Sequence, residues 1–156
     1  MQPVYIIGSG QTAVAEHWDR TAGSLAAEAL QAALGPIAKH RIQALYVANA
    51  LGSALHVQSQ LGAAIASATG LHGAEAVAFD AAGAAGGVAL RQAYLAVASG
   101  VYDLVAVVGV EKVTDVLDAR LEDGLALASD ADWEAVHGST LTAQWAMIMR
   151  RYMRQY

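Results

Sequence analysis

The chain has 156 residues, a length typical of one domain, and a formal net charge of −5. Hydrophobic residues make up 56% of it and charged residues only 15%, below the roughly 25% usual in globular proteins. This composition excludes a largely disordered chain and predicts strands buried on both faces, or a surface covered by a partner. The one basic cluster lies at residues 150–154, so we expect no nucleic-acid partner.

The chain contains no cysteine, which excludes disulfides and thiolate chemistry and is typical of a reducing compartment. No apolar run approaches the ~18 residues that a membrane span needs. The first residues also lack the charged and apolar regions of a signal peptide. We therefore expect a cytoplasmic protein without a membrane partner.

An apolar run at residues 4–7 predicts a first strand. The following residues 8–13, Gly-Ser-Gly-Gln-Thr-Ala, fit the loose dinucleotide pattern G-x-G-x-x-A. That pattern requires a helix that opens at the glycines. Here the apolar periodicity predicts the first helix only at residues 21–34, with Ser24 as its N-cap and Gly35-Pro36 as its stop. We therefore interpret the glycines as a tight structural turn.

Strands and helices are then predicted in alternation. In residues 42–48, Leu45 and Val47 alternate with Tyr46 and Ala48, as in a strand covered on two sides. Residues 104–110 have no polar face, which predicts a strand at the centre of a covered sheet. Parallel strands need crossovers, and helices supply them, so the fold class is α/β and layered. The remaining predicted elements are helices at 58–69 and 86–99 and a strand at 76–79.

The final third of the chain interrupts this alternation. Residues 114–136 are rich in acidic residues and alanine and predict an excursion with short helices. A last helix is predicted at residues 141–156, with no stop signal, which indicates a longer protein. We accordingly divide the chain into an α/β core at 1–115, an excursion at 116–138 and a C-terminal helix at 139–156.

Residues 80–87 predict a sharp turn from a strand into a helix. At a helix N-terminus the dipole favours an anion and lowers the pKa of a thiol, a setting that suits an acyl-transfer nucleophile. Gly83, Ala84 and Ala85 offer no nucleophile, acid or base. By residue chemistry alone, the favoured interpretation is a helix start built of small residues so that backbones approach closely.

The five histidines have no metal-ligand spacing, so we expect no metal site. His137 differs from the others because it lies where the excursion returns to the last helix. Together with Ala85 and Gly86 beside the turn, it forms our set of candidate pocket-lining residues. No residue was assignable to cofactor binding.

The whole chain resembles the N-terminal half of the thiolase family, in particular the sterol-carrier-protein-type thiolases and acetyl-CoA acetyltransferases. Residues 98–115 are similar to its S-G-x-x-D-x-x-x-x-x-G-x-E-K-M-T-D motif, with Val113 in place of methionine. Residues 4–13 resemble its opening strand and G-x-G-x-T-P turn, with Ala13 in place of proline. Residues 150–156 resemble its Y-M-x-x-Y segment.

At residues 80–87 the family carries E-A-A-C-x-S-G-G, whereas this chain has Gly83 at the cysteine and Ala85 at the serine. The resemblance implies the N-terminal half of a five-layer αβαβα fold, a coenzyme A thioester substrate, a role in lipid metabolism and a dimer. It also implies that the activating histidine and the second cysteine belong to a C-terminal half. Without a thiolate at position 83 the covalent step of a thiolase cannot occur.

Two functions stay open. The first is a non-catalytic acetyl-CoA acetyltransferase-like half that pairs with a C-terminal half or forms a homodimer. The second is one half of a cysteine-independent, thiolase-like aldolase that acts on acyl-CoA with an OB-fold subunit. For the partner contact we expect the helix at 58–69 and the strand at 76–79.

Overall fold

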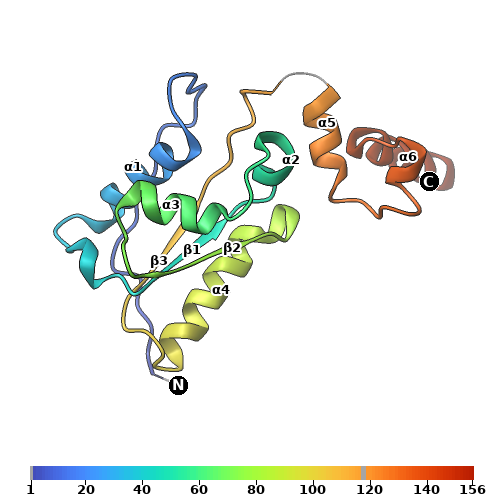
Figure 1. Cartoon of the computed structure of the whole chain (residues 1–156). Helices are drawn as coiled ribbons and strands as arrows, with labels where there is room; N and C mark the ends of the chain where they lie inside the picture. The colour runs from blue at the N-terminus through green and yellow to red at the C-terminus, as the bar shows by residue number, and fades with distance from the viewer. Residues whose placement is uncertain (1, 117–118) are drawn as a thin grey trace.

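The computed structural model describes residues 2–116 and 119–156 and contains a parallel sheet between helices (Figure 1). The strands are β1 (Ala44–Ala48), β2 (Glu75–Phe79) and β3 (Val105–Gly109), in the order β2-β1-β3 within the described residues. Ala48 lies opposite both Phe79 and Gly109, so the carboxyl ends of the strands end at one edge of the sheet.

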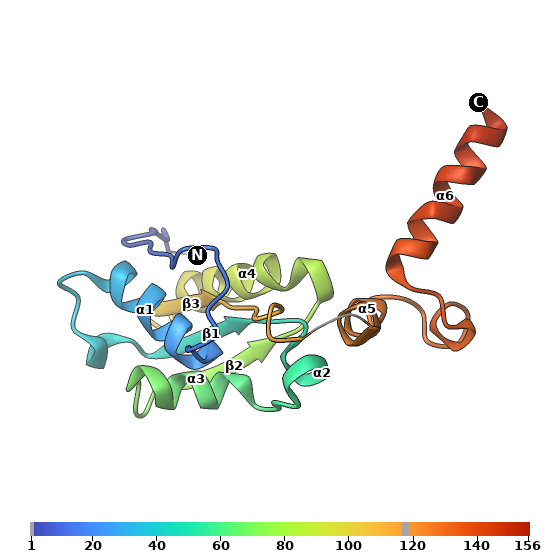
Figure 2. The same cartoon turned by 90° about the horizontal axis from the view of Figure 1, so that it is seen from above.

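Helices cover both faces of this sheet (Figure 2). α1 (Ala22–Leu34) and α3 (Leu61–Thr69) pack on one face, and α4 (Ala85–Ala98) packs on the other. In β1, Leu45 and Val47 belong to the core beneath α1 and α3, whereas Tyr46 belongs to the core beneath α4. The predicted α/β layered class is confirmed, and so is the alternation of β1.

The core elements begin and end at recognisable signals. α1 ends at Gly35, whose φ is +51°, and α3 ends at Gly70, whose φ is +74°. These are left-handed conformations that glycine adopts at low cost. The N-cap prediction for α1 was wrong, because Thr21 is the cap: its Oγ1 accepts a hydrogen bond from the Ser24 N–H at 3.1 Å.

Shorter elements connect and extend the core. A five-residue helix, α2 (Gly52–His56), follows β1, and the predicted helix at 58–69 therefore starts later, at α3. After β3 come α5 (Ala119–Ala126) and α6 (Leu141–Gln155), and α6 projects away from the sheet (Figure 2). Single 3-10 turns lie at η1 (Lys39–Arg41), η2 (Ala82–Ala84) and η3 (Ala135–His137). No helix of the described residues is long and apolar enough to cross a bilayer.

The position predicted for β3 was wrong: it lies at an edge of the described sheet, and β1 is central. Its apolar composition has a different cause. Ala106 and Val108 pack in the core beneath α1 and α3, while Val105 and Val107 pack beneath α4. Helices on both faces therefore explain the apolar run without a strand on its outer side.

The strand predicted at residues 4–7 is absent from the described sheet. The segment is extended but makes no strand pairing, and Tyr5, Ile6 and Ile7 are 62–81% exposed. Its nearest backbone hydrogen bond is that from the Gln2 N–H to the Ala98 carbonyl. An apolar run forms a strand only where an open sheet edge accepts it, and this segment lies beside none of the described strands.

The buried face predicted for α4 was only partly right. Ala85, Ala89 and Ala93 are buried against the sheet, whereas Leu90 and Tyr94 are about half exposed. Alanine allows the helix axis to approach the strands closely, so the small side chains form the inner face. The larger apolar side chains consequently point outward.

Candidate functional site

The turn at residues 80–87 has the predicted strand-to-helix form. β2 ends at Phe79, η2 follows, and α4 begins at Ala85. The Asp80 carboxylate accepts a hydrogen bond from the Ala82 N–H at 3.0 Å, and Ala82 has a φ of +46°. A left-handed alanine is strained, so this turn is held by its surroundings rather than by local preference.

Position 83 faces open space. A Cβ built on Gly83 meets no atom within 4 Å, and the same holds for Gly86 and Gly87. A side chain at position 83 would therefore be accommodated, and the first turn of α4 lies directly behind it. The place for a nucleophile is present, but this chain supplies no reactive group there.

A second constellation lies at the carboxyl ends of β1 and β3, where Asn49 and Glu111 tie two loops together. The Asn49 side-chain amide donates to the Val110 carbonyl at 2.7 Å and to the Glu111 carboxylate at 2.9 Å. The Glu111 carboxylate also accepts hydrogen bonds from the backbone N–H groups of Ala50 and Leu51. The glutamate of the E-K-x-T-D motif therefore fixes the loop that follows β1.

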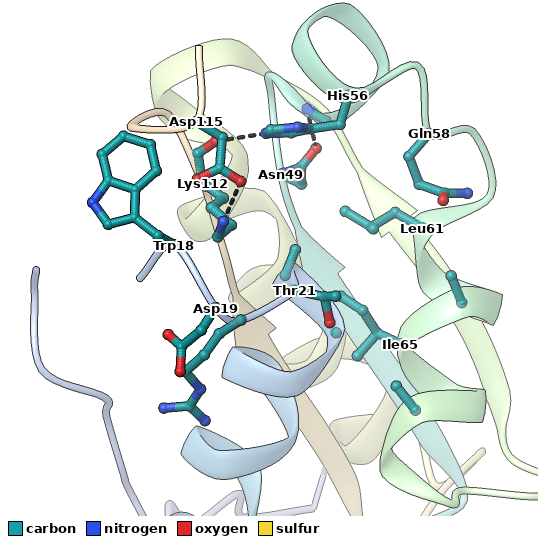
Figure 3. Close-up of a pocket in the computed structure, with 16 residues that line it drawn as sticks. Trp18, Asp19, Thr21, Asn49, His56, Gln58, Leu61, Ile65, Lys112 and Asp115 are labelled. Atoms are coloured by element: carbon teal, nitrogen blue, oxygen red, sulfur yellow. Dashed lines mark hydrogen bonds and ion pairs between the residues drawn. The ribbon is translucent and has the colours of Figure 1, made fainter. Parts of the chain in front are cut away.

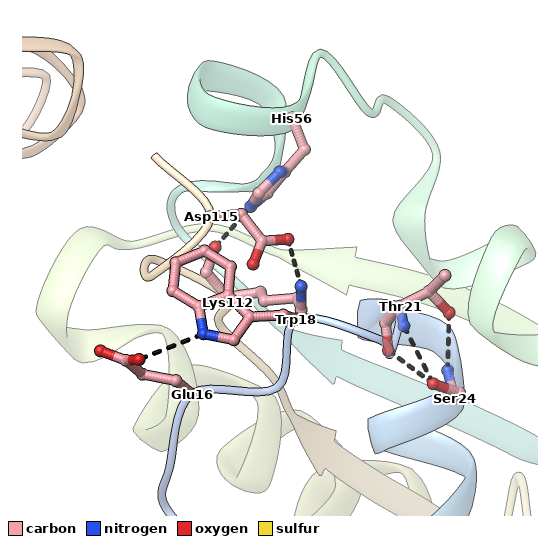
Figure 4. A network of polar contacts seen from close by, with 7 residues as sticks. All are labelled: Glu16, Trp18, Thr21, Ser24, His56, Lys112 and Asp115. Atoms are coloured by element: carbon pink, nitrogen blue, oxygen red, sulfur yellow. Dashed lines mark hydrogen bonds and ion pairs between the residues drawn. The ribbon is translucent and has the colours of Figure 1, made fainter. Parts of the chain in front are cut away.

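Lys112 continues this arrangement into the interior (Figure 4). Its ammonium forms an ion pair with the Asp115 carboxylate, and its side chain is 7% exposed. A ring nitrogen of His56, Nε2, lies 2.5 Å from the Lys112 carbonyl oxygen. Because a carbonyl only accepts, this nitrogen carries the proton and donates. The pairing satisfies a charge that would otherwise be buried alone.

These groups open onto a cavity of about 590 Å³ between α1, α3 and the strand ends (Figure 3). Trp18 lies on one side of it, and Leu61 and Ile65 form an apolar side. β1 is followed by β2 on one side and then, after α4, by β3 on the other. The cavity thus lies at a change of winding direction, where open α/β sheets bind ligands. The other lining residues include Asp19, Arg20, Thr21, Gln58 and Lys112.

The predicted site residues do not belong to this cavity. Gly83, Ala85 and Gly86 are at the start of α4, on the opposite face of the sheet, and do not line it. His137 lies in η3, and none of the hydrogen bonds of the described residues connects its ring to the turn. A pocket shared by His137, Ala85 and Gly86 stays a prediction.

The sequence interpretation missed the residues at the strand ends. Asn49 directly follows β1, and Lys112 lies shortly after β3, which is where a parallel sheet gathers its polar side chains. That position was the available signal. No three metal-ligating side chains come together in the described part of the chain.

A third polar cluster lies at the amino ends of the strands. Glu75 accepts hydrogen bonds from the hydroxyls of Tyr46 and Tyr102, each at 3.0 Å. Burial and then the hydrogen bond to Glu75 raise the pKa of Tyr46 to about 12. The hydrogen bond to Glu75 also raises the pKa of Tyr102. Both phenols stay protonated at neutral pH, so the cluster connects β1, β2 and the loop before β3 without a catalytic base.

The glycines of the loose dinucleotide pattern have a packing role. A Cβ on Gly8 would overlap the Ala33 carbonyl oxygen, and one on Gly10 would lie 2.6 Å from the Ala29 carbonyl oxygen. Both glycines therefore contact the last turns of α1 rather than its N-terminus. A pyrophosphate site at a helix N-terminus is not formed by these residues.

The fold and the strand-to-helix turn define a layered α/β protein with the frame of an acyl-transfer enzyme. The model of the thiolase N-terminal domain matches residues 4–149, and the chain belongs to the thiolase family. It is 42% identical to the acetyl-CoA acetyltransferase of Methanocaldococcus jannaschii over 158 residues. It is 38% identical to that of Methanothermobacter thermautotrophicus over 161 residues.

Each alignment covers all of this chain but only 40% and 41% of these two relatives, so the chain spans about two fifths of their length. Among solved structures it is similar to one titled Ltp2-ChsH2(DUF35) aldolase, with a TM-score of 0.61 and 28% identity. That alignment covers 97% of this chain and 38% of the other. The resemblance to the N-terminal half of the thiolase family is thereby confirmed.

Proposed function

We propose that this chain is an acetyl-CoA acetyltransferase-like N-terminal half that does not perform thiolytic chemistry by itself. It supplies the frame of an acyl-CoA site and pairs with a second chain or half. The proposal includes a coenzyme A thioester as the bound compound, a cytoplasmic location and a role in lipid metabolism. The relatives' name, acetyl-CoA acetyltransferase, supports the thioester class.

The observation that carries this proposal is the glycine at position 83. It lies between the end of β2 and the first turn of α4, where the family resemblance puts a cysteine. Ala84 and Ala85 beside it are equally inert, and the chain has no cysteine elsewhere. Covalent transfer of an acyl group requires a nucleophile at the reacting carbon, and nothing in this turn replaces one.

The test is a thiolase assay on the purified chain with acetoacetyl-CoA and coenzyme A. The acetyl-CoA acetyltransferase of M. jannaschii serves as the positive control under the same conditions. We expect the control to turn over and this chain to give the rate of the buffer. Turnover above that background would contradict the proposal.

A second candidate is one half of a thiolase-like aldolase that acts on acyl-CoA. Two observations favour it: the similarity to the aldolase structure, and the open space where a Cβ at Gly83 or Gly86 would lie. A small residue at the turn leaves room for a bulkier acyl group, and carbon–carbon cleavage does not require a thiolate. Acid and base groups would come from the second chain.

The two candidates differ in their partner. The aldolase predicts that the chain co-purifies from its native host with a different subunit of OB-fold type, whose title in the similar structure is ChsH2(DUF35). The acetyltransferase-like half predicts a C-terminal thiolase portion or a homodimer instead. Mass spectrometry of the purified complex distinguishes them, and a homodimer with no second subunit would exclude the aldolase.

A further inference from the structure

α6 carries a continuous apolar face that the rest of the described chain does not cover. Trp145, Ile148, Met149, Tyr152, Met153 and Tyr156 follow the spacing i, i+3, i+4, i+7, i+8 and i+11, which places them on one side of a helix. None of the residues of α6 is buried. A helix in water does not keep such a face exposed without an occupant for it.

The other side of α6 is basic. Arg150, Arg151 and Arg154 lie opposite the apolar face, and residues 141–155 contain no acidic side chain. α6 is attached to the molecule mainly through α5, with which it makes its principal contacts. Polar contacts near its first turn hold it there: the Gln144 amide donates to the Ser129 hydroxyl at 2.8 Å. The outer three turns project into solvent (Figure 2).

We propose that α6 is the docking helix through which this half binds its complementary C-terminal half. Its apolar face would lie in an apolar groove of that half, and acidic residues at the rim of the groove would face the arginines. This inference rests on the pairing in the proposed function. It names the element of this chain that makes the contact.

Two observations favour this occupant over a second copy of α6. The apolar face is wider than the narrow two-position seam of a coiled coil, because both Ile148 and Met149, and both Tyr152 and Met153, belong to it. A face of this width fits a groove formed by several elements. The relatives also carry about three fifths of their length beyond the part aligned with this chain, which is enough to form one.

The experiment mixes this chain with the separately expressed C-terminal remainder of the M. jannaschii acetyl-CoA acetyltransferase. A background with Trp18→Phe and Trp133→Phe leaves Trp145 as the sole tryptophan of this chain. The test variant is Ile148→Glu and the matched control is Met147→Glu. The two neighbours have nearly equal exposure, 59% and 57%, but Met147 lies on the arginine face.

We expect binding in the micromolar range or tighter by isothermal titration, with a blue shift of Trp145 emission on mixing. Ile148→Glu should weaken binding by at least about tenfold, because it buries an unpaired carboxylate. Met147→Glu should change it by less than about threefold. Circular dichroism of the free variants should match the parent, since neither position is buried.

Three results overturn the inference, and they are distinguishable. Binding that both glutamate variants leave unchanged refutes the role of α6 but keeps the pairing. Self-association of this chain alone that Ile148→Glu abolishes shows that a second copy is the occupant. Absence of any binding at high micromolar concentration refutes the pairing itself, and the docking helix with it.

Discussion

Gly83 and Gly62 illustrate two different reasons for a glycine. Gly83 faces open space, whereas a Cβ on Gly62 would lie 2.9–3.0 Å from the backbone of Val77 and Ala78 in β2. The first glycine is permitted by its surroundings, and the second is required by the packing of α3 on the strand. Substitution therefore separates a position that is chemically empty from one that is sterically closed.

We expect Gly83→Cys to change the free energy of unfolding by less than about 1 kcal/mol, since the new side chain meets no neighbour. Gly62→Ala should cost about 1–3 kcal/mol, because α3 must shift away from β2. Urea unfolding followed by circular dichroism measures both. A large loss for Gly83→Cys would contradict the open geometry of the turn.

The same Gly83→Cys variant should remain inactive in the thiolase assay. The resemblance implies that the histidine that activates the cysteine belongs to the C-terminal half, and α4 alone supplies no general base. The thiol should nevertheless react with iodoacetamide faster than a thiol in an unfolded chain, because it lies at a helix N-terminus. Urea-unfolded protein provides that reference, and equal rates would show that the helix does not activate position 83.

Tyr46 makes stability sensitive to alkaline pH. Burial and the hydrogen bond to Glu75 raise its pKa from 10.0 to about 12 in the folded protein. Between these two values the unfolded chain has lost the phenolic proton and the folded chain has kept it, so the folded state binds more protons. Its contribution to stability is therefore complete below pH 10 and is lost as the pH rises toward 12.

We expect the urea midpoint of the parent to fall between pH 10 and 12 more steeply than that of Tyr46→Phe, which has no phenol to ionise. At neutral pH, Tyr46→Phe should be slightly less stable, by about 0.5–1.5 kcal/mol, through loss of one hydrogen bond. Equal alkaline slopes for the two proteins would show that Tyr46 does not retain its proton.

Among the elements, the loops after β1 and β3 depend on Asn49. Its amide and carbonyl groups bond Val110, Glu111 and the Gly52 N–H, at 2.7–2.9 Å. Asn49→Ala should destabilise the protein by about 1–3 kcal/mol, because these partners lose a buried contact. Gln31→Ala, on the exposed side of α1, is the control and should stay within about 0.5 kcal/mol. Thermal unfolding decides between the two outcomes, and equal losses would contradict the role of Asn49.

Local patterns in the sequence were sufficient for the strands and helices of the core. The alternation of Leu45 and Val47 with Tyr46 predicted how β1 is buried, and glycines predicted where α1 and α3 end. The order of the strands was not predictable in this way. Strand order depends on which edges meet, and a run such as residues 104–110 has the same composition at an edge as at the centre when helices cover both faces.

The candidate site divides along the same line. The turn at Gly83 is contiguous in sequence, so its shape and its missing nucleophile were evident from the residues. The cluster of Asn49, His56, Lys112 and Asp115 was not, because its contacts join residues 56–62 positions apart. Only the sheet, with β1 and β3 in register, brings the two loops to one edge.

At the scale of the whole molecule, the core and the projecting helix are unequal in stability. The core residues pack in two clusters, one on each face of the sheet, and α6 contributes to neither. Because global stability comes from buried apolar area, α6 should add little to the cooperative unfolding of this chain. The division at residues 139–156 is therefore a proposal with a thermodynamic test.

Truncation after Gly138 removes α6 and leaves the sheet with its helices intact. We expect the urea midpoint of the truncated chain to lie within about 1 kcal/mol of the parent's stability, since no residue of α6 is buried. Leu30→Ala, in the core beneath α1, calibrates the assay and should cost about 2–5 kcal/mol. A loss of that size on truncation would mean that α6 is part of the cooperative core, and an unpartnered docking helix would then be excluded.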